Sequence, residues 1–206
     1  MLHQVRVRLP DRPGSLGRVT WLLGALGVDI QQVVVLGRES GRAVDEFTVE
    51  LPGSVGKERL ISTLEDVPGV VVDGVWPTST VPGAASDVAV LGQVAADPDR
   101  GLAILVDAAP RLFGADWAAL VTPNGAVAYG SVGAPSQVEP QEPVRARAYE
   151  SGGVQYAMAP LGQDDVVLLL VRTEAPGFHV AELDRLIHLV DAAAVVLAAR
   201  PVTAES

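Results

Sequence analysis

The stretch HQVRVRLPDRPGSLGRVTWLLGALG, residues 3–27, decides the fold of the first part of the chain. Its first seven residues place apolar side chains at every second position, which predicts a half-buried strand over 3–9. The apolar side chains that follow recur at helical spacing, which predicts a helix over 14–26. Gly27 then stands where a glycine commonly ends a helix. The stretch therefore predicts a strand, a tight connection and an amphipathic helix.

The segments that follow complete a recognisable order of elements. The sequence patterns predict strands over 28–37 and 43–51, a helix over 56–66 and a strand over 70–76. Together with the opening strand and helix, this order is β-α-β-β-α-β, the split βαβ arrangement of ferredoxin-like domains. We therefore expect an α+β fold that begins with a four-stranded antiparallel sheet covered by both helices on one face.

The second half of the chain predicts a different order of helices and hairpins. The patterns indicate helices over 87–96 and 99–113, a hairpin over 117–131, a short helix over 143–150, a second hairpin over 154–172 and a closing helix over 180–199. The expected product is an antiparallel sheet with flanking helices.

Two domains joined by a linker follow from these patterns. Residues 77–86 are mostly small and contain two prolines, which is typical of a linker. We therefore predict a first domain over 1–77, a linker over 78–86, a second domain over 87–200 and a tail over 201–206.

Composition excludes several classes of function. The 206 residues carry a formal net charge of −10, and such an acidic surface repels nucleic-acid backbones. The chain has no cysteine, which excludes disulfides, thiolate catalysis and cysteine-bound zinc. Its apolar stretches are too short to span a bilayer, so we expect no membrane association. No secretory leader is visible at the N-terminus, and a cytoplasmic location is the resulting expectation.

The connection between the first strand and the first helix has chemistry suited to a ligand. Its glycine lets the backbone approach a ligand closely, and the amides at a helix start attract a carboxylate. The Asp11 carboxylate could accept hydrogen bonds from an ammonium group, so the loop suits an amino acid. A purely structural interpretation stands beside this one: Asp11 caps the helix and Pro13 begins it.

Residues 3–76 resemble the ACT domain, a regulatory module of amino-acid metabolism. The resemblance is carried by the element order, by the loop Asp11-Arg12-Pro13-Gly14-Ser15-Leu16, and by Leu26-Gly27-Val28-Asp29-Ile30 at the second strand. It implies a homodimer that binds an amino acid between a loop of one copy and a strand of its neighbour. One wall of that site would be Asp11, Pro13, Gly14, Ser15 and Leu16, and the other Asp29, Ile30 and Gln31. The family more often has asparagine at the position of Asp29, so this site is more acidic than usual.

Residues 87–199 resemble a GAF domain. The resemblance is carried by the element order and by the run from Arg172 to Phe178, RTEAPGF, which leads into the closing helix. It implies either a small-molecule pocket over the sheet or a dimer contact. The residues that could line such a pocket are Tyr129, Arg145, Tyr149 and Tyr156.

No set of residues points to catalysis. The three histidines are too far apart in sequence and phase to predict a metal site, and we expect no cofactor. Neither adjacent acid pair, Asp45-Glu46 nor Asp164-Asp165, converges on one substrate atom, because neighbours on a strand point to opposite faces and turn residues face water. Both are therefore interpreted as solvated pairs.

The sequence thus predicts a non-catalytic sensor that binds an amino acid through its ACT-like part. A ligand-free dimerisation scaffold that presents the GAF-like part to a regulatory protein is the main alternative. An enzyme without a recognisable motif is the third.

Overall fold

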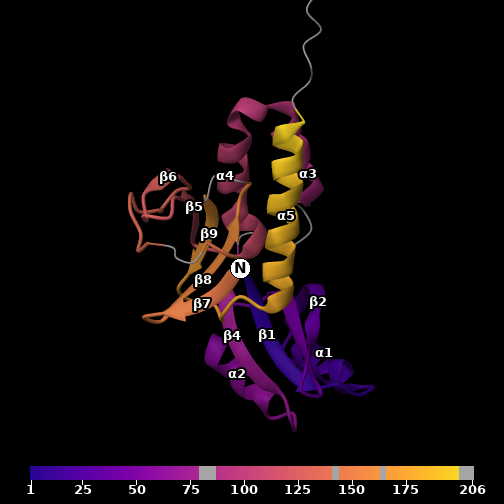
Figure 1. The fold of residues 1–206 in the computed structure, drawn as a ribbon. Helices are drawn as coiled ribbons and strands as arrows, with labels where there is room; N and C mark the ends of the chain where they lie inside the picture. The colour runs from indigo at the N-terminus through magenta and orange to yellow at the C-terminus, as the bar shows by residue number, and fades with distance from the viewer. Residues whose placement is uncertain (79–86, 141–143, 163–165, 200–206) are drawn as a thin grey trace, which may run out of the picture. The chain divides into compact units, whose positions relative to one another are not determined.

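The computed structural model describes residues 1–78, 87–140, 144–162 and 166–199. Contacts divide the chain into two compact units: residues 1–84 with 174–176, and residues 85–173 with 177–206. The predicted linker 78–86 lies outside the described residues from residue 79 onward, as does the predicted tail 201–206. Figure 1 shows the elements of both units.

The first unit contains a four-stranded antiparallel sheet with strand order β2-β3-β1-β4. Its elements are β1 (Leu2–Pro10), α1 (Ser15–Ala25), β2 (Asp29–Glu39), β3 (Arg42–Glu50), α2 (Lys57–Glu65) and β4 (Val71–Pro77). The predicted β-α-β-β-α-β order is therefore confirmed, and the predicted ranges fall within two residues of the observed ones.

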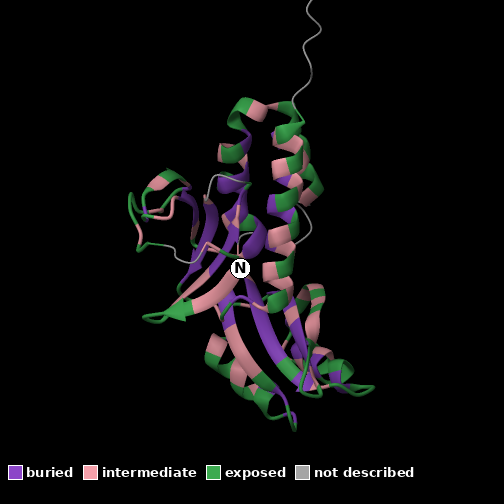
Figure 2. Ribbon diagram, viewed as in Figure 1, coloured by how far each residue is buried: buried purple, intermediate pink, exposed green. Residues whose placement is uncertain are grey.

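One apolar cluster joins the sheet to both helices. Val5 and Val7 of β1 are completely buried, and strand β1 runs through the interior of the unit (Figure 2). The same cluster contains Val19 and Leu23 from α1 and Leu60 and Leu64 from α2. Each fully buried leucine of this kind stabilises the fold by about 1.5–3 kcal/mol. Both helices therefore cover the same face of the sheet.

Helix α1 ends as its sequence predicts. The Val28 amide donates to the Leu23 carbonyl at 2.9 Å, and the Gly27 amide donates to the Gly24 carbonyl at 2.9 Å. Gly27 has φ 73°, so the chain leaves the helix through a left-handed residue. These bonds use carbonyl groups that would otherwise lack a partner at the helix end.

Strand β2 is an edge strand, and its helix-side face is only partly covered. The pairing places Val33 opposite Phe47 and Val35 opposite Asp45. Val33 is 37% exposed and Val35 is 57% exposed, although their partners on β3 are buried. An edge strand also presents unpaired backbone groups to its surroundings. This edge is therefore apolar and open to strand pairing.

The second unit contains a five-stranded antiparallel sheet with strand order β6-β5-β9-β8-β7. Its helices are α3 (Asp87–Ala96), the 3-10 helix η1 (Pro98–Arg100), α4 (Gly101–Phe113) and α5 (Val180–Ala198). Its strands are β5 (Trp117–Val121), β6 (Val127–Gly130), β7 (Arg147–Ser151), β8 (Val154–Pro160) and β9 (Val167–Arg172). The sheet has apolar clusters on both faces, and residues from α3, α4 and α5 share one of them.

The predicted short helix over 143–150 is wrong. Residue 143 lies outside the described residues, and Arg147–Ser151 form strand β7, which pairs antiparallel with β8. Tyr149 lies opposite Tyr156, and their rings stack with centroids 4.9 Å apart. Gly152 and Gly153 connect the strands with φ 61° and 81°, as a tight hairpin turn requires. The predicted second hairpin is therefore part of a three-stranded meander.

A buried ion pair fixes the start of helix α5. The Arg172 guanidinium donates to both carboxylate oxygens of Glu182, at 3.0 and 3.2 Å, and lies 3.8 Å from the centroid of the Phe178 ring. Arg172 is only 1% exposed. Glu182 also accepts the His179 amide at 2.7 Å, which completes a capping box at the helix start. One carboxylate thus joins strand β9 to helix α5.

Among the described residues, no helix has the length and apolar character needed to cross a membrane.

Candidate functional site

The loop between β1 and α1 is a compact turn that ends in a left-handed glycine. The Arg12 amide donates to the Pro10 carbonyl at 2.8 Å, and the Ser15 amide donates to the Arg12 carbonyl at 3.2 Å. Gly14 follows with φ 87°, directly before the first helical residue. A residue with a Cβ atom is strained in that conformation. Glycine at this position therefore sets the direction in which α1 leaves the loop.

Helix α1 begins without a side-chain cap. Its N-cap residue is Gly14, which makes no such bond. The Ser15 and Arg18 amides donate to loop carbonyls. Across the described part of the chain, no acceptor is found for the two amides between them, those of Leu16 and Gly17. Free amides and the helix dipole together attract an anion, so this end of α1 suits a carboxylate.

Asp11 does not cap the helix. Its carboxylate oxygen Oδ2 lies 3.0 Å from Nε of Arg38, and its backbone amide donates to the Gly41 carbonyl at 3.1 Å. Asp11 therefore attaches the loop to the β2–β3 hairpin. The capping interpretation of Asp11 is wrong, and its carboxylate already has a cationic partner at the surface.

The other predicted loop residues differ in exposure. Pro13 and Gly14 are exposed, Leu16 is 36% exposed, and Ser15, the first residue of α1, is buried. Ser15 is thus removed from solvent, whereas Pro13, Gly14 and Leu16 are accessible.

The second predicted wall lies at the far end of the same sheet. Asp29 pairs with Glu50, which pairs with Leu2, whereas the loop follows Pro10 at the opposite end of β1. Asp29 and Gln31 are exposed, and the Gln31 amide donates to the Asp29 carboxylate at 2.6 Å.

Ile30 is partly buried and packs against the apolar cluster of the first unit.

The two predicted walls are far apart within one chain. Eight residues of extended strand separate the two ends of β1, about 27 Å at 3.4 Å per residue. One chain therefore does not bring the two walls together.

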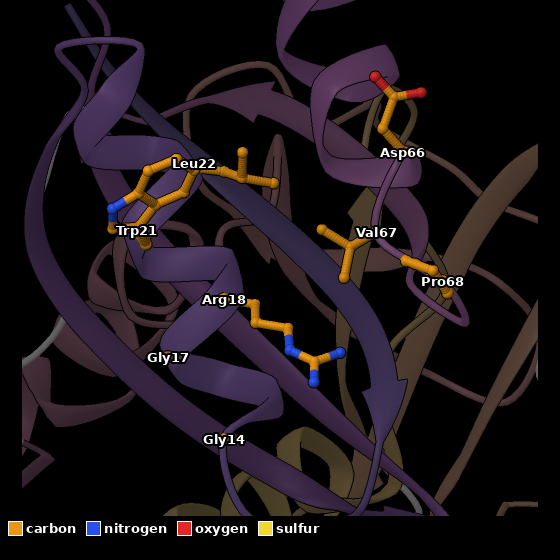
Figure 3. A pocket seen from close by; sticks show the side chains of 8 residues that line it. All are labelled: Gly14, Gly17, Arg18, Trp21, Leu22, Asp66, Val67 and Pro68. Atoms are coloured by element: carbon orange, nitrogen blue, oxygen red, sulfur yellow. The ribbon is translucent and has the colours of Figure 1, made fainter.

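A cavity of about 590 Å³ lies on the helix side of the first unit, between α1 and the turn after α2. In Figure 3 the Arg18 side chain extends from α1 toward that turn, and Leu22 and Val67 lie on opposite sides of the space. The residues that line the cavity are Gly14, Gly17, Arg18, Trp21, Leu22, Asp66, Val67 and Pro68. Of the predicted site residues, Gly14 is in this lining.

The Asp45 carboxylate is buried, whereas the sequence predicts that it is exposed to solvent. It is 1% exposed, and its oxygen Oδ1 is buried with no hydrogen-bond partner in the described structure. Burial, and secondly the neighbouring Asp11 carboxylate, raise the pKa of Asp45 above its ordinary value of 3.8. The interpretation of Asp45-Glu46 as a solvated pair is therefore wrong.

Glu46 is partly buried on the other face of the sheet. Its carboxylate pairs with the Arg6 guanidinium at 2.6 Å, and Arg6 lies 5.6 Å from the centroid of a Trp76 ring. The two adjacent acids do point to opposite faces, as the strand geometry predicts. The other acidic pair, Asp164-Asp165, lies outside the described residues.

The aromatic residues considered for the second unit have partners of their own. The Tyr129 hydroxyl donates to the Asp107 carboxylate at 2.9 Å, and Tyr149 and Tyr156 stack on paired strands. Within the described ranges, no three histidine, aspartate or glutamate side chains form a group that could hold a metal ion.

Comparison with known proteins places the first unit in a family. Residues 3–70 match the model of the ACT domain. No curated protein matches the chain.

Several solved structures are similar at low identity. The ACT domain from the GTP pyrophosphokinase of Chlorobium tepidum is 17% identical, with a TM-score of 0.33, and the match covers 42% of this chain and 94% of that one. The regulatory subunit of aspartate kinase from Thermus thermophilus is 14% identical, with a TM-score of 0.34 and coverage of 96% and 91%. A formyltetrahydrofolate deformylase from Pseudomonas putida KT2440 is 16% identical, with a TM-score of 0.32, and this match covers 40% of the present chain and 31% of the deformylase.

The family match, the strand order and the loop before α1 agree with one another. The match does not extend into the second unit, for which the resemblance to a GAF domain stays a prediction. Residues 3–70 of this chain form an ACT domain.

Proposed function

We propose that this chain is a non-catalytic regulatory protein that binds an amino acid at its ACT domain. The free amides of Leu16 and Gly17, behind the left-handed Gly14, are the observation that carries the proposal. They offer a binding position for a carboxylate, the group that all amino acids share.

The complete site requires two copies of the chain. The two predicted walls belong to opposite ends of the sheet, and β2 is an open, partly apolar edge. If the β2 strands of two copies pair antiparallel, the start of one β2 lies beside the end of the other. That end carries Arg38, which holds Asp11 and the loop. Such pairing brings Asp29 of one copy toward the loop of its partner, so a homodimer through β2 supports the proposal.

The second unit would transmit or complete the response. We propose for it the GAF-like role of a second sensing or contact module, on the basis of its antiparallel sheet with helices on one face. A regulatory protein would then read the state of this unit.

Thermal unfolding and calorimetry with each common amino acid test the proposed function. A ligand present at 100 times its Kd stabilises the folded protein by about 2.7 kcal/mol, which shifts the melting temperature clearly. The absence of heat and of any melting shift for every amino acid would contradict amino-acid binding.

The open β2 edge also favours the second candidate, a ligand-free dimerisation scaffold. A scaffold of this kind would form a stable dimer and would show neither heat nor a melting shift with any amino acid. Measurement of the molecular mass in solution, with and without amino acids, separates the two candidates.

A further inference from the structure

Asp45 occupies a position in the ACT domain where an apolar residue is expected. Along β3 it shares the helix-side row with Ala43, Phe47 and Val49, all of which belong to the apolar cluster. Its oxygen Oδ1 is out of contact with solvent and has no hydrogen-bond partner in the described structure. A carboxylate in this environment costs free energy unless a cation or donor reaches it.

Asp45 lies near the end of the sheet from which the loop before α1 leaves. Ala43, two residues earlier on the same face, pairs with Leu9, and the loop begins two residues after Leu9. Helix α1 starts after a connection of four residues, so its first turn lies over this end of the sheet. The Asp11 carboxylate is close enough to affect the charge state of Asp45.

Asp45 is also close to the uncovered edge of the sheet. On one side it pairs with Val7, which is completely buried, and on the other with Val35, which is 57% exposed. Strand β2 has no further neighbour in the sheet. The exposed helix-side surface at Val35 therefore lies one strand away from Asp45.

We propose that Asp45 is the carboxylate that receives the ammonium group of the bound amino acid. This inference rests on the proposed function and changes the assignment within the site. The Leu16 and Gly17 amides hold the carboxylate end of the ligand, Asp45 holds the ammonium end, and Asp11 with Arg38 forms the rim. Asp11 is less suited to the ammonium group because it already pairs with the Arg38 guanidinium at 3.0 Å. The ligand class is a compound with both groups, so the corresponding hydroxy acids are rejected.

The test compares three forms of the full chain by calorimetry: wild type, Asp45→Asn and Glu58→Gln. The probe is the amino acid that shifts the melting temperature most, together with the hydroxy acid that has the same side chain. Glu58 is an exposed acid on α2, so its substitution removes the same charge outside the site. We expect Asp45→Asn to weaken binding at least about tenfold, since a hydrogen bond to a charged group is lost. Glu58→Gln should bind the amino acid as tightly as wild type does. The hydroxy acid should bind to none of the three forms.

The possible failures are distinguishable. If Asp45→Asn binds the amino acid as tightly as wild type, or if the hydroxy acid binds equally well, Asp45 does not receive the ammonium group, while the proposed function stands. If wild type binds no amino acid, both the proposed function and this inference are overturned. A melting temperature of ligand-free Asp45→Asn at or above that of wild type shows that weakened binding does not come from unfolding.

Discussion

Gly14 has a left-handed backbone conformation and stands directly before the amides proposed to bind the ligand. Its left-handed conformation turns the chain into α1 and leaves two amides of the first turn without a protein acceptor. A Cβ atom at this position would meet open space, so crowding is not the obstacle. The cost of any other residue there comes from the backbone conformation itself.

Substitution of Gly14 by alanine tests this point, with Gly24→Ala on the same helix as the matched control. We expect Gly14→Ala to lower the free energy of unfolding by about 1–2 kcal/mol, because an L-residue is strained at positive φ. Gly24 is a helical residue with open space around it, so Gly24→Ala should raise stability by up to about 1 kcal/mol. Urea unfolding measures both. Equal effects of the two substitutions would contradict the role of φ at Gly14.

Asp45 predicts a pH dependence of stability in the ligand-free protein. Burial, then the Asp11 carboxylate, raise its pKa in the folded state above 3.8, so the folded protein binds the proton more tightly than the unfolded chain. The resulting stabilisation is complete below pH 3.8 and is lost as the pH rises through the higher folded-state pKa.

Asp45→Asn lacks this titration. The stability of the variant relative to wild type should therefore increase with pH across that window and stay constant above it. Urea unfolding at a series of pH values checks the trend. A difference that does not change with pH would show that Asp45 titrates alike in both states.

Single residues also show where sequence reasoning reached its limit. Adjacent acids on a strand were correctly predicted to face opposite sides, yet both were expected in water. The alternation Ala43, Asp45, Phe47 and Val49 could have placed Asp45 in the interior row, because every second residue shares a face. The Asp11–Arg38 pair had no comparable signal, since it joins residues far apart in the chain and depends on the hairpin after β2.

At the scale of elements, the first unit was predictable because its signals are local. Apolar spacing identifies α1, the glycine after it marks its end, and alternation identifies β1. Strand β7 was missed because Ala and Arg, which favour helices, fill the stretch before Tyr149. Pairing with β8 and the stacked tyrosines override that preference. The Gly152-Gly153 pair was the available sign of a hairpin. The cavity beside α1 arises only when α2 is in place, so no local pattern predicts it.

The start of α5 supplies a prediction at this scale. Glu182→Ala removes the carboxylate that pairs with the buried Arg172 and completes the capping box. We expect a loss of about 3–5 kcal/mol in the free energy of unfolding, the usual cost of removing one partner of a buried pair. Asp184→Ala, an exposed acid on the same helix, should change stability by at most about 0.5 kcal/mol. Chemical denaturation compares the two, and similar small effects would contradict the anchoring role of Glu182.

At the scale of the whole molecule, the choice of edge strand determines the assembly. The first sheet has two edges, β2 and β4, which expose Val33 at 37% and Val71 at 40%. We expect Val33→Lys to weaken the dimer about tenfold or more, because a lysine on an edge strand opposes pairing with another chain. Val71→Lys should leave the dimer intact. Sedimentation equilibrium measures the association of each variant, and the reverse pattern would assign the dimer to β4.

The opposite placement of Asp29 and the Asp11–Leu16 loop has a consequence for sensing under the proposed function. Where each site is assembled from two chains, occupancy depends on the abundance of the protein as well as on the metabolite. Dilute protein would respond only at high metabolite levels, and newly synthesised protein would lower that threshold by mass action. By thermodynamic reciprocity, the metabolite would tighten the dimer by the same factor by which dimerisation tightens metabolite binding. Such a molecule reports a product of two concentrations, and its expression level sets its sensitivity.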